Sequence, residues 1–119
     1  NVTYTGWLAS RDIEEYFMDA DALVIPSRWE GFAMVPLEAM SYSLPVISSN
    51  ATSLPEVVKD GKTGFLFRNG DADALVSILA KLHQFDLAEL GKNGNEFFIS
   101  EFTSDKMIEK TNSLYRALQ

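Results

Sequence analysis

Three short and continuous apolar runs constrain the fold of this chain more than any other feature. They cover residues 22–25, 45–48 and 65–67. A strand exposed on one face alternates apolar and polar residues, whereas a continuous run is typical of a strand covered on both faces in a parallel sheet. Stretches with helical features separate the runs, and strands that alternate with helices form βαβ units. The sequence therefore predicts an α/β fold, a three-layer sandwich around a mostly parallel sheet.

Helix signals lie between and after these runs. Ser10 and Asp71 are of a type that caps a helix, and Pro36 suits the first turn of a helix because that position needs no backbone donor. The Pro36 helix should run through about Tyr42. Thr103 or Ser104 is expected to cap the last helix. Further helical segments are expected at residues 54–58, 86–99 and 104–118.

The amino end of the sequence is expected to form a short opening strand. The chain starts at Asn1, without methionine, directly on the strand-like residues Val2, Tyr4 and Trp7. From this abrupt start we infer that upstream sequence is missing.

Length and composition limit the classes of function. The 119 residues suffice for one cored domain, so residues 1–119 are predicted to form a single domain. The net charge of -7 and the scattered Lys and Arg side chains disfavour a nucleic-acid-binding surface. Cysteine is absent and His83 is the one histidine, so neither a disulfide framework nor a metal cluster is expected. No apolar run approaches the roughly 20 residues that span a bilayer.

The central loop and the helix after it carry the clearest candidate site. Backbone N–H groups at the start of a helix are unpaired and attract phosphates, and Gly31 lets a ligand approach the loop closely. Glu30 and Glu38 flank this helix start. Their carboxylates would repel a diphosphate, so we expect them to face hydroxyl groups, with which they form charge-assisted hydrogen bonds. A diphosphate between two polyols is a nucleotide sugar. Two Glu residues at this spacing also occur by chance, and the helix dipole alone favours Glu in a first turn.

The residues around the pair resemble a known family. Pro-Ser-Arg-Trp-Glu-Gly-Phe (26–32), Pro-Leu-Glu-Ala-Met (36–40), Leu-Pro-Val-Ile-Ser (44–48) and the run from Leu54 to Phe67 are similar to the carboxyl-terminal domain of GT-B glycosyltransferases of family 4 (glycosyltransferase group 1). Glu30 and Glu38 match its E-x7-E motif. The resemblance implies a Rossmann-like sandwich that is a truncated carboxyl-terminal GT-B domain, with the start of the domain and an amino-terminal acceptor domain absent.

The resemblance also implies roles for individual residues. Glu30, the catalytic candidate, would contact hydroxyls of the transferred sugar, and Glu38 the ribose hydroxyls of the nucleotide. Ala33 stands where many relatives have a second glycine, so a methyl group could narrow the approach of the donor. The loop and helix residues that would hold the sugar and diphosphate through backbone amides are Gly31, Phe32, Ala33, Met34, Val35 and Leu37.

The activity implied is transfer of a sugar, with retention of anomeric configuration and no required metal, from a UDP-, GDP- or ADP-sugar to a glycan, lipid or small-molecule acceptor. The basic residues that grip the diphosphate would lie outside residues 1–119, so we expect this chain alone not to turn over substrate. Intact relatives commonly work in the cytoplasm at the inner face of the cytoplasmic membrane. Peripheral membrane association of the full-length enzyme is therefore compatible with the resemblance.

Two other readings of the sequence stay open. A stand-alone module could bind a nucleotide or nucleotide sugar without chemistry, and a flavodoxin-like receiver would share the size, acidity and βα alternation. The receiver reading needs a phosphorylatable Asp at a strand end, where this chain has Pro26 and Ser27.

Among other residues near the site, Trp29 is expected to pack, and Thr52 or Ser53 could touch the donor. Glu56 is expected to lie close to the donor site and to support the residues that bind the donor, without touching the donor itself.

Overall fold

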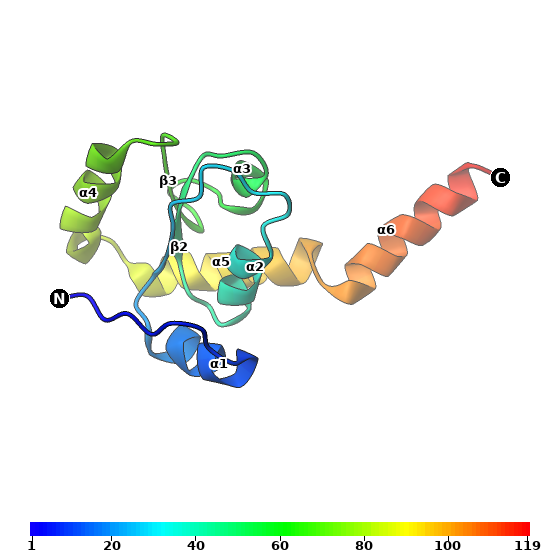
Figure 1. Ribbon diagram of the computed structural model, residues 1–119. Coiled ribbons are helices and arrows are strands. Elements are labelled where there is room, and N and C mark those ends of the chain that lie inside the picture. Colours follow the sequence, from blue (N-terminus) through cyan, green and yellow to red (C-terminus); the bar gives the residue numbers. More distant parts are fainter.

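The computed structural model describes residues 1–119 as an α/β fold around a three-stranded parallel sheet (Figure 1). The strands are β1 (Leu23–Ile25), β2 (Val46–Ser49) and β3 (Gly64–Phe67), in the order β1-β2-β3. In the register, Val24 lies opposite Ile47, and Ile47 lies opposite Phe65. The apolar runs thus form the strands that the sequence predicted.

Helices precede, connect and follow these strands. Helix α1 (Ser10–Asp19) precedes β1, α2 (Met34–Ser41) connects β1 to β2, and α3 (Leu54–Val57) lies between β2 and β3. After the sheet come α4 (Ala72–Ala80), a 3-10 turn (Leu82–Gln84), α5 (Leu87–Glu101) and α6 (Ser104–Ala117).

The core lies around β2 and α2. All residues of β2 are buried, and α2 packs against β1, β2 and α5, while α4 packs against β3. Met40, Leu54, Val46 and Val58 are among the fully buried members of one hydrophobic cluster. Phe17 attaches α1 to this cluster and stacks near Tyr42, with ring centroids 5.8 Å apart.

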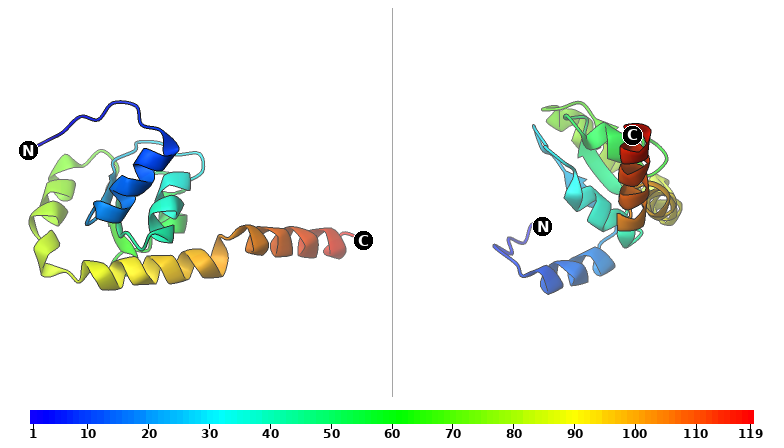
Figure 2. Two further views of the ribbon diagram at one scale, coloured as in Figure 1. Left: turned by 90° about the horizontal axis from the view of Figure 1, so that it is seen from below. Right: turned by 90° about the vertical axis from the view of Figure 1, so that its right-hand side faces the viewer.

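Helix α6 projects away from the body of the molecule. It contacts α5 at the junction of the two helices, and in the left view of Figure 2 its far end stands clear of the other elements. Thr103 caps it by accepting a hydrogen bond from the Lys106 amide, as predicted. None of its residues is buried.

Two local predictions were wrong. The opening strand does not form: residues 1–9 belong to no strand or helix, and Val2, Tyr4 and Trp7 are at least 94% exposed. Alternating apolar residues favour a strand, but a strand also needs a neighbour, and β1 pairs only with β2. Ser10 does not cap α1 either, because the helix already includes it and the N-cap is Ala9.

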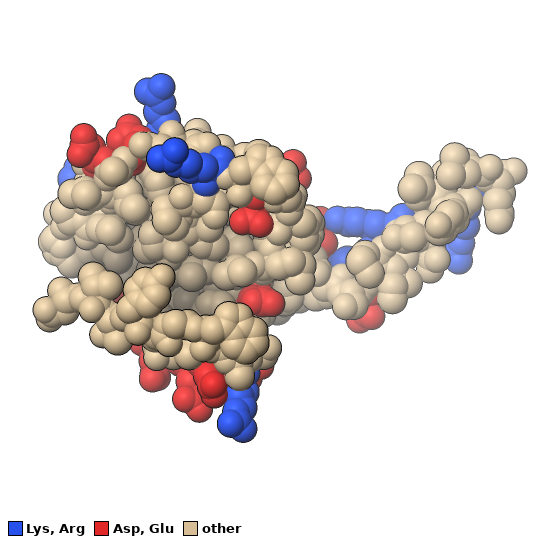
Figure 3. All heavy atoms as spheres, in the orientation of Figure 1, with Lys and Arg blue, Asp and Glu red and all other residues tan.

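The surface is acidic overall, with a formal net charge of -7. On the face seen in Figure 3, the Lys and Arg side chains are dispersed, and acidic atoms gather below, along the outer side of α1. No helix is both long and apolar enough to cross a bilayer.

Candidate functional site

The candidate site lies where the three parallel strands end. Because the strands run in the same direction, the loops that follow them emerge at one edge of the sheet, the side on which α3 lies in Figure 1. In open α/β sheets this edge is where ligands bind. The loop of residues 26–33 leaves β1 there and leads directly into α2.

Side chains from the neighbouring loops hold the β1–α2 loop in place. The Ser49 hydroxyl donates a hydrogen bond to the Ser27 carbonyl, and the Asn69 side-chain amide donates to the Arg28 carbonyl at 2.9 Å. The backbone N–H of Asn69 in turn donates to Asn50 Oδ1 at 2.8 Å. The ends of all three strands are therefore joined by polar contacts.

Backbone N–H groups at the start of α2 are free. The amides of Gly31, Phe32 and Val35 make no hydrogen bond within the chain, whereas the Met34 amide donates to the Phe32 carbonyl at 2.9 Å. A helix start with unpaired donors carries partial positive charge, so this segment can accept an anion. The Ala33 amide is also unpaired, but Ala33 has no exposed surface, so a ligand reaches it only if the loop shifts.

The two predicted carboxylates have no partner within the protein. Neither Glu30 nor Glu38 forms a side-chain hydrogen bond or an ion pair. Glu38 is exposed and Glu30 is partly buried, and in the sequence they lie on either side of the free amides. Carboxylates left without protein partners are available as acceptors for hydroxyl donors of a ligand.

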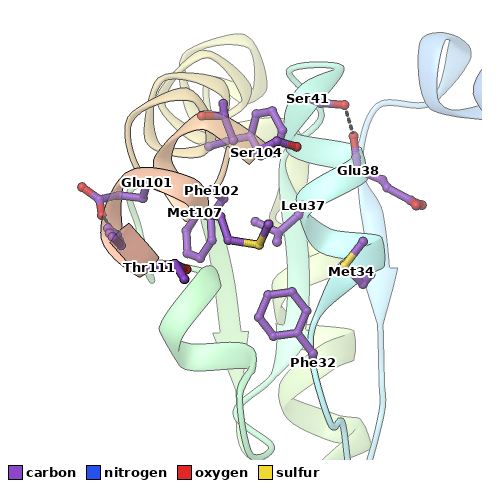
Figure 4. Close-up of a pocket in the computed structure, with 13 residues that line it drawn as sticks. Phe32, Met34, Leu37, Glu38, Ser41, Glu101, Phe102, Ser104, Met107 and Thr111 are labelled. Carbon is purple, nitrogen blue, oxygen red and sulfur yellow. Dashed lines mark hydrogen bonds and ion pairs between the residues drawn. The ribbon is translucent and has the colours of Figure 1, made fainter. Parts of the chain in front are cut away.

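An apolar cavity of about 760 Å³ adjoins the same segment. Phe32, Met34 and Leu37 line it from the loop and α2, and Phe102 and Met107 line it from the opposite side (Figure 4). Glu38 contributes to the rim, but its carboxylate points away from the cavity. The structure therefore separates the predicted residues into an apolar group that faces this cavity and a group outside it: Glu30, Gly31, Ala33 and Val35.

One other residue of the loop, Trp29, differs from its predicted role. Trp29 does not pack in the core: its side chain is 74% exposed and lies beside Gly31, where an added Cβ would be 3.6 Å from the ring. Thr52 and Ser53 bind the Glu30 backbone. Sequence reasoning placed Asn50 at the same sheet edge as the Glu30 loop but missed Ser49 and Asn69. The available signal was that each lies at, or within two residues of, the end of a predicted strand.

No group of three or more His, Cys, Asp or Glu side chains is arranged to hold a metal ion. The chemistry that this site offers is hydrogen bonding and electrostatics. Free amides can bind an anion, and the two carboxylates can bind hydroxyl groups on either side of it.

Comparison with known proteins adds three findings. The family model for glycosyl transferases group 1 matches residues 1–97. The O-antigen chain mannosyltransferase B of Escherichia coli is 33% identical over 118 residues, which cover 98% of this chain and 30% of that protein. The chain spans only about a third of the length of the curated relatives that it matches, or less: it covers 33% of a 41.2 kDa protein of the Klebsiella pneumoniae cps region and 19% of an Arabidopsis thaliana sulfoquinovosyl transferase.

Solved structures agree on the architecture. A sucrose-phosphate synthase from Thermosynechococcus elongatus superposes with a TM-score of 0.85 and 32% identity, over 98% of this chain and 30% of that one. Anabaena HepE, solved in complex with UDP and glucose, superposes with a TM-score of 0.83 and 23% identity, over 97% of this chain and 32% of that one. At 23% identity, the likeness to HepE establishes only that the two chains share a fold.

Proposed function

Because this chain belongs to the group 1 glycosyltransferases and has the fold of the carboxyl-terminal GT-B domain, we propose that it is the donor-binding part of a retaining glycosyltransferase. The donor is a nucleoside diphosphate sugar, and the acceptor is a glycan, lipid or small molecule. The observation that carries the proposal is the row of free amides at the start of α2, flanked by two unengaged carboxylates.

Each part of the donor has a counterpart in the site. The diphosphate lies against the helix start, near Gly31 and Val35, where the helix dipole and free N–H groups favour negative charge. Glu30 accepts hydrogen bonds from the transferred sugar, and Glu38 accepts them from the ribose. The exposure of the Glu38 carboxylate supports this assignment, because a ribose can reach it without displacing a protein partner.

Catalysis in this scheme is electrostatic. The bond between the anomeric carbon and the diphosphate oxygen breaks, the acceptor hydroxyl oxygen bonds to the same face of the sugar, and the hydroxyl proton passes to the departing diphosphate. The negative charge that develops on the departing diphosphate is stabilised by fixed amide dipoles, which is the kind of interaction that lowers a barrier most. No metal is required in this proposal. Basic groups from outside residues 1–119 complete the diphosphate site, and a separate amino-terminal domain supplies the acceptor site at the cytoplasmic face of the membrane.

The test is a titration of the ¹⁵N-labelled chain with UDP-glucose, GDP-mannose and ADP-glucose, followed by NMR. We expect one donor class to shift the amides of residues 31–38, and Glu38→Ala to weaken this response. Glu15→Ala is the matched control, because Glu15 is exposed on α1 and lies outside the site. Shifts confined to other regions, or equal responses from the two variants, would contradict the proposal.

The same chain should not transfer sugar by itself. Incubated with the donor that it binds and an acceptor, it should release nucleoside diphosphate no faster than a buffer control. Turnover above that control would show that residues 1–119 already contain the catalytic groups, contrary to the proposal.

A further inference from the structure

Thr52, in the loop between β2 and α3, has an unusual backbone conformation. Its φ is 41°, and the only other residue besides glycine with a positive φ is Ser43. For a β-branched side chain this region is sterically unfavourable. Strain of this kind persists only where the surrounding contacts hold it in place. The contacts of Thr52 therefore indicate what the strain supports.

The Thr52 hydroxyl binds both backbone groups of Glu30. It accepts a hydrogen bond from the Glu30 N–H at 2.9 Å and donates one to the Glu30 carbonyl at 2.5 Å. The hydroxyl of Ser53 approaches the same carbonyl at 3.4 Å. Thr52 and Glu30 are 22 positions apart in the sequence, so these bonds fasten the loop after β1 to the loop after β2.

This pair of bonds fixes the direction of the Glu30 side chain. The N–H and carbonyl of a residue lie on either side of its Cα, so holding both of them fixes the Cα–Cβ bond. The carboxylate itself stays free of protein partners and keeps only its side-chain rotations. A hydroxyl has one proton to donate, and that of Thr52 is already given to Glu30. Thr52 therefore has no proton left for a ligand.

We propose that Thr52 is a positioning residue that aims the Glu30 carboxylate at the hydroxyls of the transferred sugar, and so sets the sugar-dependent part of donor affinity. This inference rests on the proposed function of Glu30. It assigns Thr52 an indirect role, whereas the sequence left open a direct contact of Thr52 or Ser53 with the donor.

Three substitutions separate the hydroxyl from the strain. Thr52→Val keeps the shape and removes both hydrogen bonds, and Thr52→Ser keeps the hydroxyl and removes the methyl group. Thr52→Gly also removes the bonds, but a glycine adopts the positive φ without strain, so this variant should fold even where Thr52→Val does not. If the hydroxyl is what positions Glu30, Thr52→Val and Thr52→Gly should therefore change donor binding in the same way.

The readouts are hydrogen exchange at the Glu30 amide and the dissociation constants for the donor that the titration selects and for its nucleoside diphosphate. For a uridine donor these two ligands are UDP-glucose and UDP, and for the other donor classes the GDP or ADP pair takes their place. In the unmodified chain UDP-glucose should bind more tightly than UDP. Thr52→Val and Thr52→Gly should abolish most of this difference while changing UDP affinity less than about twofold, and should speed exchange at Glu30 about tenfold, the loss expected for one hydrogen bond. Thr52→Ser should restore both properties.

The outcomes distinguish the two proposals. An unmodified chain that binds none of UDP-glucose, GDP-mannose and ADP-glucose, or that binds its preferred donor no more tightly than the matching nucleoside diphosphate, overturns the proposed function and with it the role of Thr52. A clear preference for UDP-glucose that survives in Thr52→Val and Thr52→Gly overturns the role of Thr52 alone. Parallel loss of UDP and UDP-glucose binding also overturns it, because a purely structural role would weaken both ligands together.

Discussion

Gly91 in α5 lies directly against the carbonyl oxygen of Ser43. A Cβ built on Gly91 would be 1.8 Å from that oxygen and 3.3 Å from Pro45 Cδ. Glycine is therefore required here for close approach of α5 to the turn between α2 and β2. The Gly-Lys-Asn-Gly sequence at residues 91–94 lies inside α5 and serves helix packing.

Gly91→Ala should therefore destabilise the chain. Alanine favours a helix by roughly 1 kcal/mol over glycine, but its methyl group collides with backbone that cannot rotate away. Overpacking typically costs about 1–3 kcal/mol, and a collision with backbone should cost about 3 kcal/mol, the upper end of this range. After the gain in helix propensity is subtracted, we expect a net loss of about 2 kcal/mol in the free energy of unfolding. Urea denaturation followed by circular dichroism measures it.

The control is Lys92→Ala, at the next position of the same helix. Lys92 is exposed and forms only a loose surface ion pair with Glu96 at 3.9 Å, so its loss should change stability by less than about 0.5 kcal/mol. Equal midpoints for Gly91→Ala and the unmodified chain would show that α5 can move away from Ser43 at little cost.

The sequence was sufficient to predict those elements that depend on residues close together in the chain. Continuous apolar runs located β1, β2 and β3, and short polar side chains located the caps of α4 and α6 at Asp71 and Thr103. These succeed because a cap or a buried strand depends mainly on residues close in the chain.

Features that depend on distant residues were not predictable. The opening strand failed because pairing needs a neighbour that periodicity cannot reveal. The burial of Ala33 and the contacts of Asn69 and Thr52 with the β1–α2 loop join residues far apart in sequence. Sequence therefore indicated which residues flank the helix start, and the structure was needed to show what holds them there.

The two flanking carboxylates should differ in the part of the donor that they affect. Glu30→Gln should weaken binding of UDP-glucose but not of UDP, whereas Glu38→Gln should weaken both, because ribose is common to the two ligands. Charge-assisted hydrogen bonds contribute about 1.5–3 kcal/mol each, so losses of about tenfold or more are expected. Isothermal titration calorimetry of both variants, with Glu15→Gln as control, measures this. Equal effects of Glu30→Gln on both ligands would contradict the assignment.

The junction of α5 and α6 should depend on pH. Lys110 Nζ donates to Glu101 Oε2 at 2.8 Å, and this hydrogen bond, with the positive charges of Lys110 and Lys106, lowers the pKa of Glu101. A lowered pKa in the folded state stabilises the fold above the ordinary carboxylate pKa, and this contribution is lost as the pH falls through the lowered value. Lys110→Gln should raise the pKa of Glu101, as NMR titration of its side-chain carbon would show.

The free energies of unfolding of the unmodified chain and of Lys110→Gln, compared across pH, provide an independent test. The unmodified chain should be slightly more stable than Lys110→Gln at neutral pH, and the difference should vanish once the pH is below the Glu101 pKa of the unmodified chain. Because Glu101 is exposed, the difference should be small. A difference that grows on acidification would exclude this ion pair as its cause.

Asn69 and Asn93 provide a matched pair for testing how the β1–α2 loop is held. Each side-chain amide donates one exposed hydrogen bond to a distant carbonyl, Asn69 to Arg28 at 2.9 Å and Asn93 to Lys62 at 3.1 Å. Asn69→Ala and Asn93→Ala should therefore lower stability similarly, by about 1 kcal/mol each. Only Asn69 joins the loop that precedes the free amides, so only Asn69→Ala should weaken UDP-glucose binding and speed amide exchange in residues 28–33. If both variants bind UDP-glucose equally well, the Arg28 contact does not order the site, and the bonds from Ser49 and Thr52 suffice to hold the loop.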